Sequence, residues 1–217
     1  MISQKNILIT GTDTDVGKTI FAAGLTAALN ATYWKPIQAG FDAGTDSEVV
    51  ARFSGQPIVP EAYKLATPAS PHYAAEQDNV ELELGNLTIP EISGGGHLII
   101  EAAGGLMVPL KRPDSNGQGG ILAIDMFATW GVPTILCART SLGTINHSLL
   151  SVKALKDAGI AIMGIVFIGD ENIDSQQTII EFANVPDLGR LPILNPLTRE
   201  SLLAAIQAEI RLELMKL

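Results

Sequence analysis

A glycine-containing segment between an apolar strand and an apolar helix constrains this chain more than any other feature. Residues 7–10 read Ile-Leu-Ile-Thr, residues 11–19 read Gly-Thr-Asp-Thr-Asp-Val-Gly-Lys-Thr, and apolar residues then recur at helical spacing over 18–29. This order is typical of a phosphate loop, in which backbone N–H groups and a helix N-terminus converge on phosphate oxygens. Lys18 adds a full positive charge, and the Thr19 hydroxyl is suited to ligate Mg²⁺. We therefore expect nucleotide binding; the alternative is an ordinary turn between a strand and a helix.

The glycine spacing departs from the usual phosphate-loop pattern. Five residues separate Gly11 from Gly17, one more than usual, and Thr12 stands where the first glycine is common. The loop is therefore a variant whose context, strand before and helix after, still favours phosphate binding.

Short β-branched runs alternate with longer amphipathic stretches, as in α/β proteins. Strands are expected at 7–10, 33–35, 97–100, 134–138 and 163–168. Helices are expected at 18–29, 47–53, 121–130, 145–157, 175–182 and 199–214. Because several strands are apolar at every position, both faces of a mostly parallel sheet should be covered by helices. We expect one P-loop NTPase-like α/β domain over residues 1–217, with the irregular segment 56–96, which holds one short helix, as a substrate lid.

Composition excludes a disulfide scaffold and argues against nucleic-acid binding. The chain has one cysteine, and 14 Lys and Arg against 23 Asp and Glu give a net charge of −9 at pH 7. No basic patch offsets this charge, so phosphate backbones should be repelled. No apolar run approaches the ~18 residues of a membrane span, and the amino terminus lacks the pattern of a signal peptide. We expect a soluble, reduced, cytoplasmic protein without nucleic-acid or membrane partners.

Three oxygen-bearing side chains form a candidate magnesium site. Glu101 ends the buried strand 97–100, and Asp46 opens a helix after the second strand. Because ligands of open α/β sheets lie outside the carboxyl ends of the strands, Glu101 is expected near Thr19. Carboxylate and hydroxyl oxygens are hard ligands suited to Mg²⁺. The alternative for Asp46 is a helix N-cap.

Two further features lie where predicted strands end. Lys35 ends a predicted strand, and Pro36 after it removes a backbone donor as the chain leaves the sheet. Because the Lys35 ammonium at this strand end can face the phosphate site, Lys35 is a candidate catalytic cation. The alternative is a surface lysine. Residues 140–147 join a buried strand to a helix, and their N–H groups predict a second anion site suited to a carboxylate. The alternative there is helix capping by Thr144.

Seven motifs of this sequence resemble those of the dethiobiotin synthetase family over nearly the whole chain. They are the phosphate loop 11–19, unchanged from the family pattern G-T-D-T-[DE]-V-G-K-T, then Lys-Pro-Ile-Gln-Ala-Gly at 35–40, Asp46, Ser-Pro-His at 70–72, Glu-Ala-Ala-Gly-Gly at 101–105, Leu-Gly-Thr-Ile-Asn-His at 142–147 and Gly-Arg-Leu-Pro at 189–192, which matches a late turn of the family. Three positions depart from it. Ala39 replaces a frequent hydroxyl residue, Ala102 replaces a glycine, and Gly169 stands where many relatives carry an asparagine that reads adenine.

The resemblance implies an ATP- and Mg²⁺-dependent cyclo-ligase of biotin biosynthesis. Such an enzyme converts 7,8-diaminononanoate and CO₂ or bicarbonate into dethiobiotin, through a carbamate and a carbamic-phosphoric anhydride, and releases ADP and phosphate. It implies catalytic roles for Lys35, Lys18 and Thr14, and a metal bound by Thr19, Asp46 and Glu101. It further implies a homodimer that holds the remote substrate carboxylate at the turn 142–146.

The residue sets that the resemblance carries over are larger. The implied ATP contacts are Asp15, Val16, Gly17, Lys18, Thr19, Ile20, Glu101, Ala102, Ala103, Gly104, Gly169, Asp170, Pro192, Ile193 and Leu194. The implied substrate contacts are Lys35, Ala39, Leu142, Gly143 and Asn146.

The rival interpretation is a nucleotide-gated partitioning or assembly ATPase on the same scaffold. Those proteins usually place a second lysine early in the phosphate loop, where this chain has Thr12 and Asp13. A GTPase would need an Asn-Lys-x-Asp segment, which the sequence lacks. The ligase is therefore the favoured hypothesis.

Overall fold

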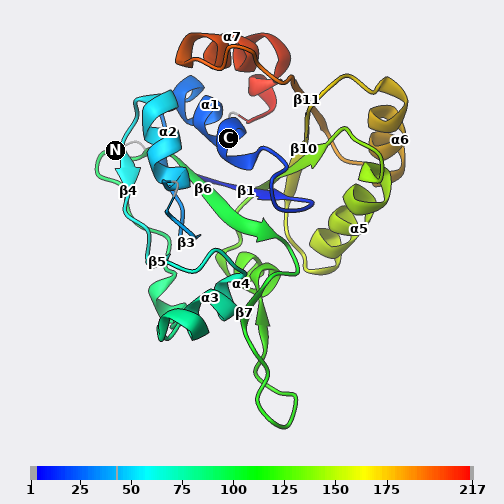
Figure 1. The fold of residues 1–217 in the computed structure, drawn as a ribbon. Coiled ribbons are helices and arrows are strands. Elements are labelled where there is room, and N and C mark those ends of the chain that lie inside the picture. The colour runs from blue at the N-terminus through cyan, green and yellow to red at the C-terminus, as the bar shows by residue number, and fades with distance from the viewer. Residues whose placement is uncertain (1–3, 43, 216–217) are drawn as a thin grey trace.

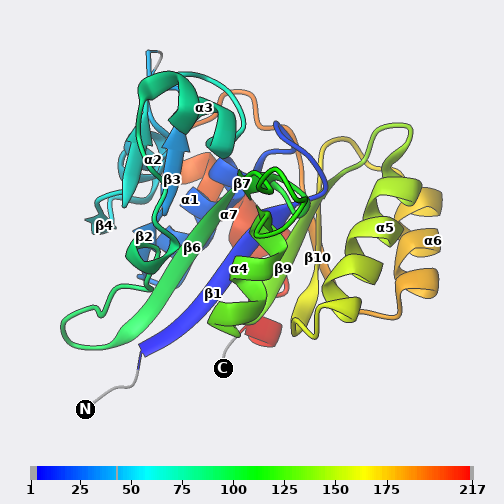
Figure 2. The same cartoon turned by 90° about the horizontal axis from the view of Figure 1, so that it is seen from below.

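The computed structural model describes residues 4–42 and 44–215 (Figures 1 and 2). Seven strands form its central sheet: β1 (Gln4–Gly11), β2 (Thr32–Trp34), β4 (Ile58–Val59), β6 (Gly96–Gly105), β9 (Thr134–Arg139), β10 (Ile162–Ile168) and β11 (Asp187–Leu191). Their order is β11-β10-β9-β1-β6-β2-β4, and every neighbouring pair is parallel. The predicted parallel α/β sheet is confirmed.

Two small ribbons flank this sheet. In one, β3 (Ile37–Ala39) pairs in parallel with β5 (Tyr63–Leu65); in the other, β7 (Pro109–Lys111) pairs antiparallel with β8 (Ile121–Leu122). The β7–β8 hairpin projects from the body of the molecule at the bottom of Figure 1. Its tip carries no buried residue, so it contributes little to the core.

Helices cover both faces of the sheet (Figure 2). The cluster on one face includes side chains of α1 (Lys18–Ala28), α2 (Asp46–Ser54) and α7 (Arg199–Glu209). The clusters on the other face include side chains of α3 (Pro71–Asp78), α4 (Ala123–Trp130), α5 (Thr144–Asp157) and α6 (Ile173–Ala183). Along β1, Ile7 and Ile9 join the first cluster and Leu8 the second, which explains why this strand is apolar throughout. None of the helices in the described part of the chain is long and apolar enough to cross a membrane.

The structure corrects three predicted elements. The helix predicted at 199–214 is too long, because Ile210 leaves α7 in an extended conformation and bridges to Gly189, before the short helix η2 (Leu212–Met215). The predicted turn at 189–192 lies largely within β11, which pairs with β10. Residues 56–96 contain β4, β5, α3 and the turn of 3-10 helix η1 (Leu84–Asn86), so this segment is less irregular than predicted.

Candidate active site

The phosphate loop joins β1 to α1 at the carboxyl edge of the sheet. Gly17 is the N-cap of α1 with a φ of 94°, and no side chain caps this helix start, so its N–H groups remain available to an anion. A Cβ on Gly17 would lie 2.8 Å from Cγ2 of Ile168, besides straining the backbone. The second glycine of the motif is therefore required by the approach of β10.

Lys18 lies buried beneath the loop rather than extended into solvent. Its Nζ donates to the carbonyl oxygen of Asp13 at 2.8 Å. Burial lowers the pKa of Lys18, and the carboxylate of Glu101 partly opposes that shift. The Asp13 carboxylate accepts from the Thr14 N–H at 2.7 Å through Oδ1 and pairs with Nη2 of Arg139 at 2.8 Å through Oδ2. Arg139, which sequence reasoning missed, thus ties the loop to the end of β9.

The register of two parallel strands places Tyr33, Lys35 and Glu101 together. Tyr33 pairs with Ile99, and Trp34 with Ile100, across β2 and β6. Because side chains alternate along a strand, Tyr33 and the next odd residue, Lys35, share the face of Ile99 and Glu101. This is the face covered by α1, which brings Thr19 to the same place.

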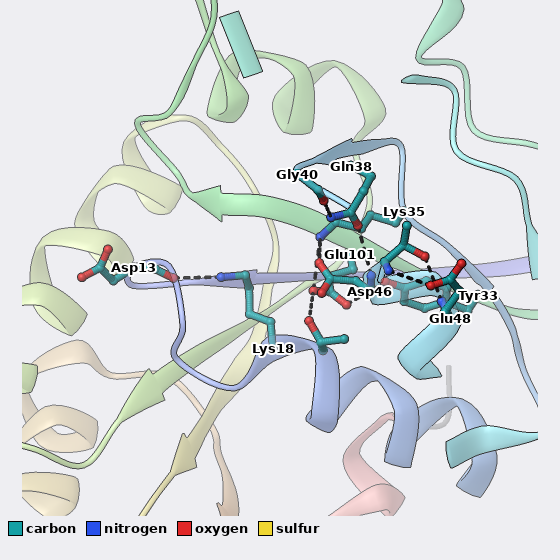
Figure 3. Close-up of polar contacts among 11 residues, drawn as sticks. Asp13, Lys18, Tyr33, Lys35, Gln38, Gly40, Asp46, Glu48 and Glu101 are labelled. Carbon is teal, nitrogen blue, oxygen red and sulfur yellow. Dashed lines mark hydrogen bonds and ion pairs between the residues drawn. The ribbon is translucent and has the colours of Figure 1, made fainter. Parts of the chain in front are cut away.

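A charged cluster forms at this point (Figure 3). Lys35 Nζ lies 2.6 Å from Oδ2 of Asp46 and 3.4 Å from Oε1 of Glu101. The Thr19 hydroxyl donates to the same Oε1 at 2.8 Å, and the Tyr33 hydroxyl donates to Oε2 of Glu101 at 2.8 Å. Glu101 and Lys35 are 1% and 4% exposed, so both charges are shielded from water. Each charge is stable at this depth only with an opposite charge beside it.

The electrostatics follow from this burial. Burial opposes the charge of Lys35, but Glu101 and Asp46 together outweigh it and raise the pKa of Lys35. Burial, with the nearby Glu101 carboxylate, raises the pKa of Tyr33 well above its ordinary range, so the phenol remains a hydrogen-bond donor. The cluster therefore holds an ammonium, two acidic side chains and two hydroxyl donors in fixed directions.

Two alternatives considered for Lys35 and Asp46 are wrong. Lys35 is neither a surface side chain nor an unpaired cation, since it contacts two carboxylates. Asp46 is not the N-cap of α2: Thr45 occupies that position, its hydroxyl accepts from the N–H of Glu48, and the Glu48 carboxylate accepts from the N–H of Thr45. The Asp46 carboxylate is consequently free to point into the cluster.

Two adjoining cavities meet at this cluster. The first is lined by Thr14, Asp15, Gly17, Lys18, Thr19, Ile20, Lys35, Asp46, Glu101 and Gly104. The second has a volume of about 540 Å³ and is lined by Thr14, Asp15, Lys35, Gln38, Ala39, Asp46, Pro68, Ala69, Ser70, Pro71, Ala103, Gly104 and Val108. Lys35 and Asp46 line both, so they form part of the wall between a phosphate-side cavity and a second cavity walled by residues 68–71. Asp78 holds that wall, since its carboxylate accepts from Thr67 Oγ1 at 2.6 Å.

A third cavity lies on the other side of the phosphate loop, toward β10 and α6. It has a volume of about 420 Å³ and is lined by Asp15, Val16, Gly17, Arg139, Thr140, Ser141, Ile168, Gly169, Asp170, Glu171, Asn172 and Ile193. Gly169 there donates to Leu191 and accepts from Nη1 of Arg190, so its backbone groups are already bonded. Of the later predicted ATP contacts, Gly169, Asp170 and Ile193 line this cavity.

The remaining predicted residues divide into two groups. Leu142 and Gly143 line a small cavity with Thr12, Asp13, Arg139, Thr144 and His147, whereas Asn146 does not line it. Ala102 is buried, and Pro192 and Leu194 line none of these cavities, although their neighbour Ile193 does. The structure therefore does not bring Ala102, Asn146, Pro192 and Leu194 to the walls of these cavities.

The start of α5 differs from the capping alternative. Gly143 is the N-cap and no side chain caps the helix, while the Thr144 hydroxyl donates to the carbonyl of Arg139. Helix capping by Thr144 is thus wrong, and the N–H groups at this helix start stay available to an anion.

The donor set fits Mg²⁺ bound together with phosphates. Among residues 4–42 and 44–215, no cluster of three or more His, Cys, Asp and Glu side chains could hold a metal ion alone. Mg²⁺, however, is usually held by one or two carboxylates and by substrate phosphates. Thr19, Asp46 and Glu101 supply a hydroxyl and two carboxylates beside the phosphate loop, which matches that chemistry.

The parallel sheet and the phosphate loop together define a P-loop nucleotide-binding domain, and comparisons with known proteins agree. A family described as AAA domain matches residues 5–201. In fold, the chain is similar to a ParA family ATPase from Chlorobium tepidum TLS, with a TM-score of 0.53, 13% identity, and coverage of 94% of this chain and 89% of that one. The signal recognition particle receptor FtsY from Elizabethkingia anophelis in complex with GDP gives a TM-score of 0.51 at 13% identity, covering 88% and 58%.

Sequence similarity is much closer to one group of enzymes. ATP-dependent dethiobiotin synthetase BioD of Rhodopseudomonas palustris (strain BisB18) is 54% identical over 210 residues, covering 95% of this chain and 96% of the relative. The protein of the same description from Sphingopyxis alaskensis is 52% identical over 201 residues, covering 93% and 94%. The chain belongs to the dethiobiotin synthetase family.

Proposed function

We propose that this protein is an ATP-dependent ligase that closes the ring of dethiobiotin from 7,8-diaminononanoate and CO₂, in biotin biosynthesis. The observation that carries the proposal is the position of Lys35 and Asp46 in the wall shared by the phosphate-side cavity and the 68–71 cavity. A reaction that joins a phosphoryl group to a carbamate needs a cation at the boundary between the two cavities, and Lys35 supplies it. Relatives more than half identical over nearly their full length bear the same activity in their names.

The chemistry divides into three bond changes. One amine of the substrate adds to CO₂ and loses a proton, which forms an N–C bond and a carbamate anion. A carbamate oxygen attacks the γ-phosphorus of ATP, and the bond to the ADP oxygen breaks. The second amine then attacks the carbonyl carbon, phosphate leaves, and the ring closes with loss of a proton.

The roles of the side chains follow from charge. Both the carbamate and the transferring phosphoryl group are anionic, so fixed cations stabilise the transition state without any nucleophilic side chain. We assign that stabilisation to Lys18 and Lys35, and the positioning of phosphate to Thr14. When bound, Mg²⁺ supplies charge neutralisation on the β- and γ-phosphates, and Thr19, Asp46 and Glu101 would hold it.

The base and substrate contacts complete the proposal. The third cavity, with Gly169, Asp170 and Ile193, would take the base, and the 68–71 cavity with Ala39 would take the diamine. The start of α5, with Leu142 and Gly143, would bind the remote carboxylate of a substrate held by a second copy of the chain. Leu142 is fully exposed, which suits burial in a homodimer.

We place this one-domain enzyme in the cytoplasm, in keeping with its single buried cysteine.

The test is product formation. ATP hydrolysis that depends on both diaminononanoate and bicarbonate, with dethiobiotin identified by mass, is expected. ATP hydrolysis stimulated by DNA or a protein partner instead, without dethiobiotin, would support the partitioning ATPase; the fold similarity to a ParA family ATPase alone does not favour it at 13% identity. Light scattering beside turnover tests the dimer, because a fully active monomer would contradict a shared substrate site.

A further inference from the structure

The ammonium of Lys35 stands between the two carboxylates that are proposed to hold the metal. It lies 2.6 Å from Asp46 Oδ2 and 3.4 Å from Glu101 Oε1 (Figure 3). Oε2 of Glu101 accepts from the Tyr33 hydroxyl, whereas Oε1 accepts from both the Thr19 hydroxyl and the Lys35 ammonium. Lys35 therefore joins Oε1 of Glu101 to Oδ2 of Asp46.

A divalent cation and this ammonium compete for the same oxygens. Mg²⁺ binds oxygen ligands at about 2.0–2.1 Å, closer than either contact of Lys35. An ammonium left between the same two oxygens would then lie within a few ångströms of a double positive charge, in a place where burial makes repulsion strong. A metal ion bound to Oδ2 of Asp46 and Oε1 of Glu101 would therefore displace the ammonium from these two oxygens.

We propose that Lys35 is an internal stand-in for the divalent cation. Without nucleotide, its ammonium pairs with Asp46 and Glu101 and offsets one of their two negative charges; when the metal and nucleotide bind, Lys35 leaves these oxygens and turns toward the 68–71 cavity. The inference rests on the proposed function, because it takes Mg²⁺ as the cation. It goes further by assigning Lys35 a second role, in which it competes with the metal before it meets the carbamate.

Burial gives the physical reason for such a stand-in. Glu101 is 1% exposed, and a buried carboxylate without a cation is strongly unfavourable. Lys35 offsets one of the two negative charges, and it already lines the 68–71 cavity. Its charge thus becomes available to the second substrate only after the metal nucleotide is in place, which orders the two binding events.

The test compares Mg²⁺ binding in three proteins saturated with ADP, measured by calorimetry. Lys35→Met removes the competing charge at similar length, so the Kd for Mg²⁺ should fall by about tenfold. Lys35→Arg keeps the charge, so its Kd should stay within about threefold of the wild type. The Kd for ADP without Mg²⁺ should change little in either variant. An unchanged or weaker Mg²⁺ affinity in Lys35→Met overturns the proposal, since a purely catalytic or purely structural lysine predicts those results.

A measurement on the wild type covers the case in which Lys35→Met fails to fold. The ¹⁵N resonance of the Lys35 ammonium, assigned by its loss in Lys35→Arg, should shift when Mg²⁺ is added to the ADP complex and not when ADP is added alone. No shift on adding Mg²⁺ overturns the stand-in role.

The two proposals fail separately. If the wild type forms dethiobiotin while Lys35→Met leaves Mg²⁺ affinity unchanged, the ligase stands and the stand-in falls. If Lys35→Met binds Mg²⁺ more tightly but the wild type forms no dethiobiotin, the stand-in role of Lys35 stands and the ligase function is wrong. Absence of Mg²⁺ binding to the wild-type ADP complex overturns the stand-in outright.

Discussion

Two ion pairs beside the phosphate loop have nearly the same length and very different surroundings. Lys35 and Asp46 are 2.6 Å apart with side chains 5% and 34% exposed, whereas Arg139 and Asp13 are 2.8 Å apart with side chains 43% and 53% exposed. Coulomb energy rises as the local dielectric falls, so the inner pair is the stronger interaction and also the more costly to desolvate. An exposed pair of the outer kind is worth about 0–1 kcal/mol.

The difference separates two tasks. The inner cluster has its directions fixed by burial, so it suits charge stabilisation in a reaction. The outer pair is accessible to water and ions, so it suits the adjustment of a loop and of base choice. The predictions below test this division, beginning with the inner cluster.

Removal of Lys35 should have the largest effect. Lys35→Ala is expected to lower dethiobiotin turnover by roughly 10²–10³-fold, the usual loss for a fixed electrostatic donor. Lys153→Ala is the matched control, because Lys153 forms an exposed pair with Asp157 on α5. Turnover of Lys35→Ala near that of the wild type would remove Lys35 from the mechanism.

Removal of one metal-facing charge should have the next largest effect. Asp46→Asn keeps the shape and loses the carboxylate, so the Mg²⁺ concentration for half-maximal turnover should rise by roughly tenfold. Asp157→Asn on α5 is the control for loss of an exposed aspartate. Overlapping Mg²⁺ titrations of Asp46→Asn and the wild type would show that Asp46 is not a ligand.

Base choice tests the third cavity, which Arg139 of the outer pair also lines. Gly169 has no side chain, its N–H and carbonyl are bonded to Leu191 and Arg190, and the Asn172 carboxamide caps α6 by accepting from Ser175. Position 169 therefore offers neither a side chain nor a free backbone group to read a base, so GTP or CTP should support kcat/KM within about tenfold of ATP, where ~1.4 kcal/mol is one decade.

The opposing outcome is equally sharp. A preference for ATP above about a thousandfold over every other triphosphate exceeds what one bidentate contact of roughly 1–3 kcal/mol explains, and would contradict relaxed selectivity. Gly169→Asn is a poor rescue variant, because the φ of 131° and the nearby Thr140 hydroxyl leave no room for a Cβ.

The outer ion pair should give the smallest effect. A double-mutant cycle of Arg139→Gln and Asp13→Asn, read as the Kd for ADP, should yield a coupling of about 0.2–1 kcal/mol. The pair Arg112 and Glu76, 2.6 Å apart and similarly exposed on the β7–β8 hairpin and α3, serves as the control and should yield no coupling in ADP binding. A coupling above about 2 kcal/mol would show that the outer pair contributes more to ADP binding than its exposure to solvent predicts.

Local sequence determined much of this protein. Apolar strands such as β1 indicate burial on both faces, and the order of strand, loop, Gly17, Lys18 and helix indicates a phosphate site, because each signal depends on neighbours in the chain. The same logic, that parallel strands end at one edge, correctly predicted Glu101 near Thr19, although Glu101 does not end its strand as expected, because β6 runs on to Gly105.

Tertiary structure alone decided the partners of these groups. The pairing of Tyr33 with Glu101 depends on the β2–β6 register, the release of Asp46 depends on Thr45 taking the cap, and the pair of Arg139 with Asp13 joins residues far apart in sequence. Lys35 could be read as a surface or a catalytic lysine until its burial was known. A sequence specifies which charges a chain carries, but their dielectric surroundings and the distances between them exist only once the strands and helices have packed.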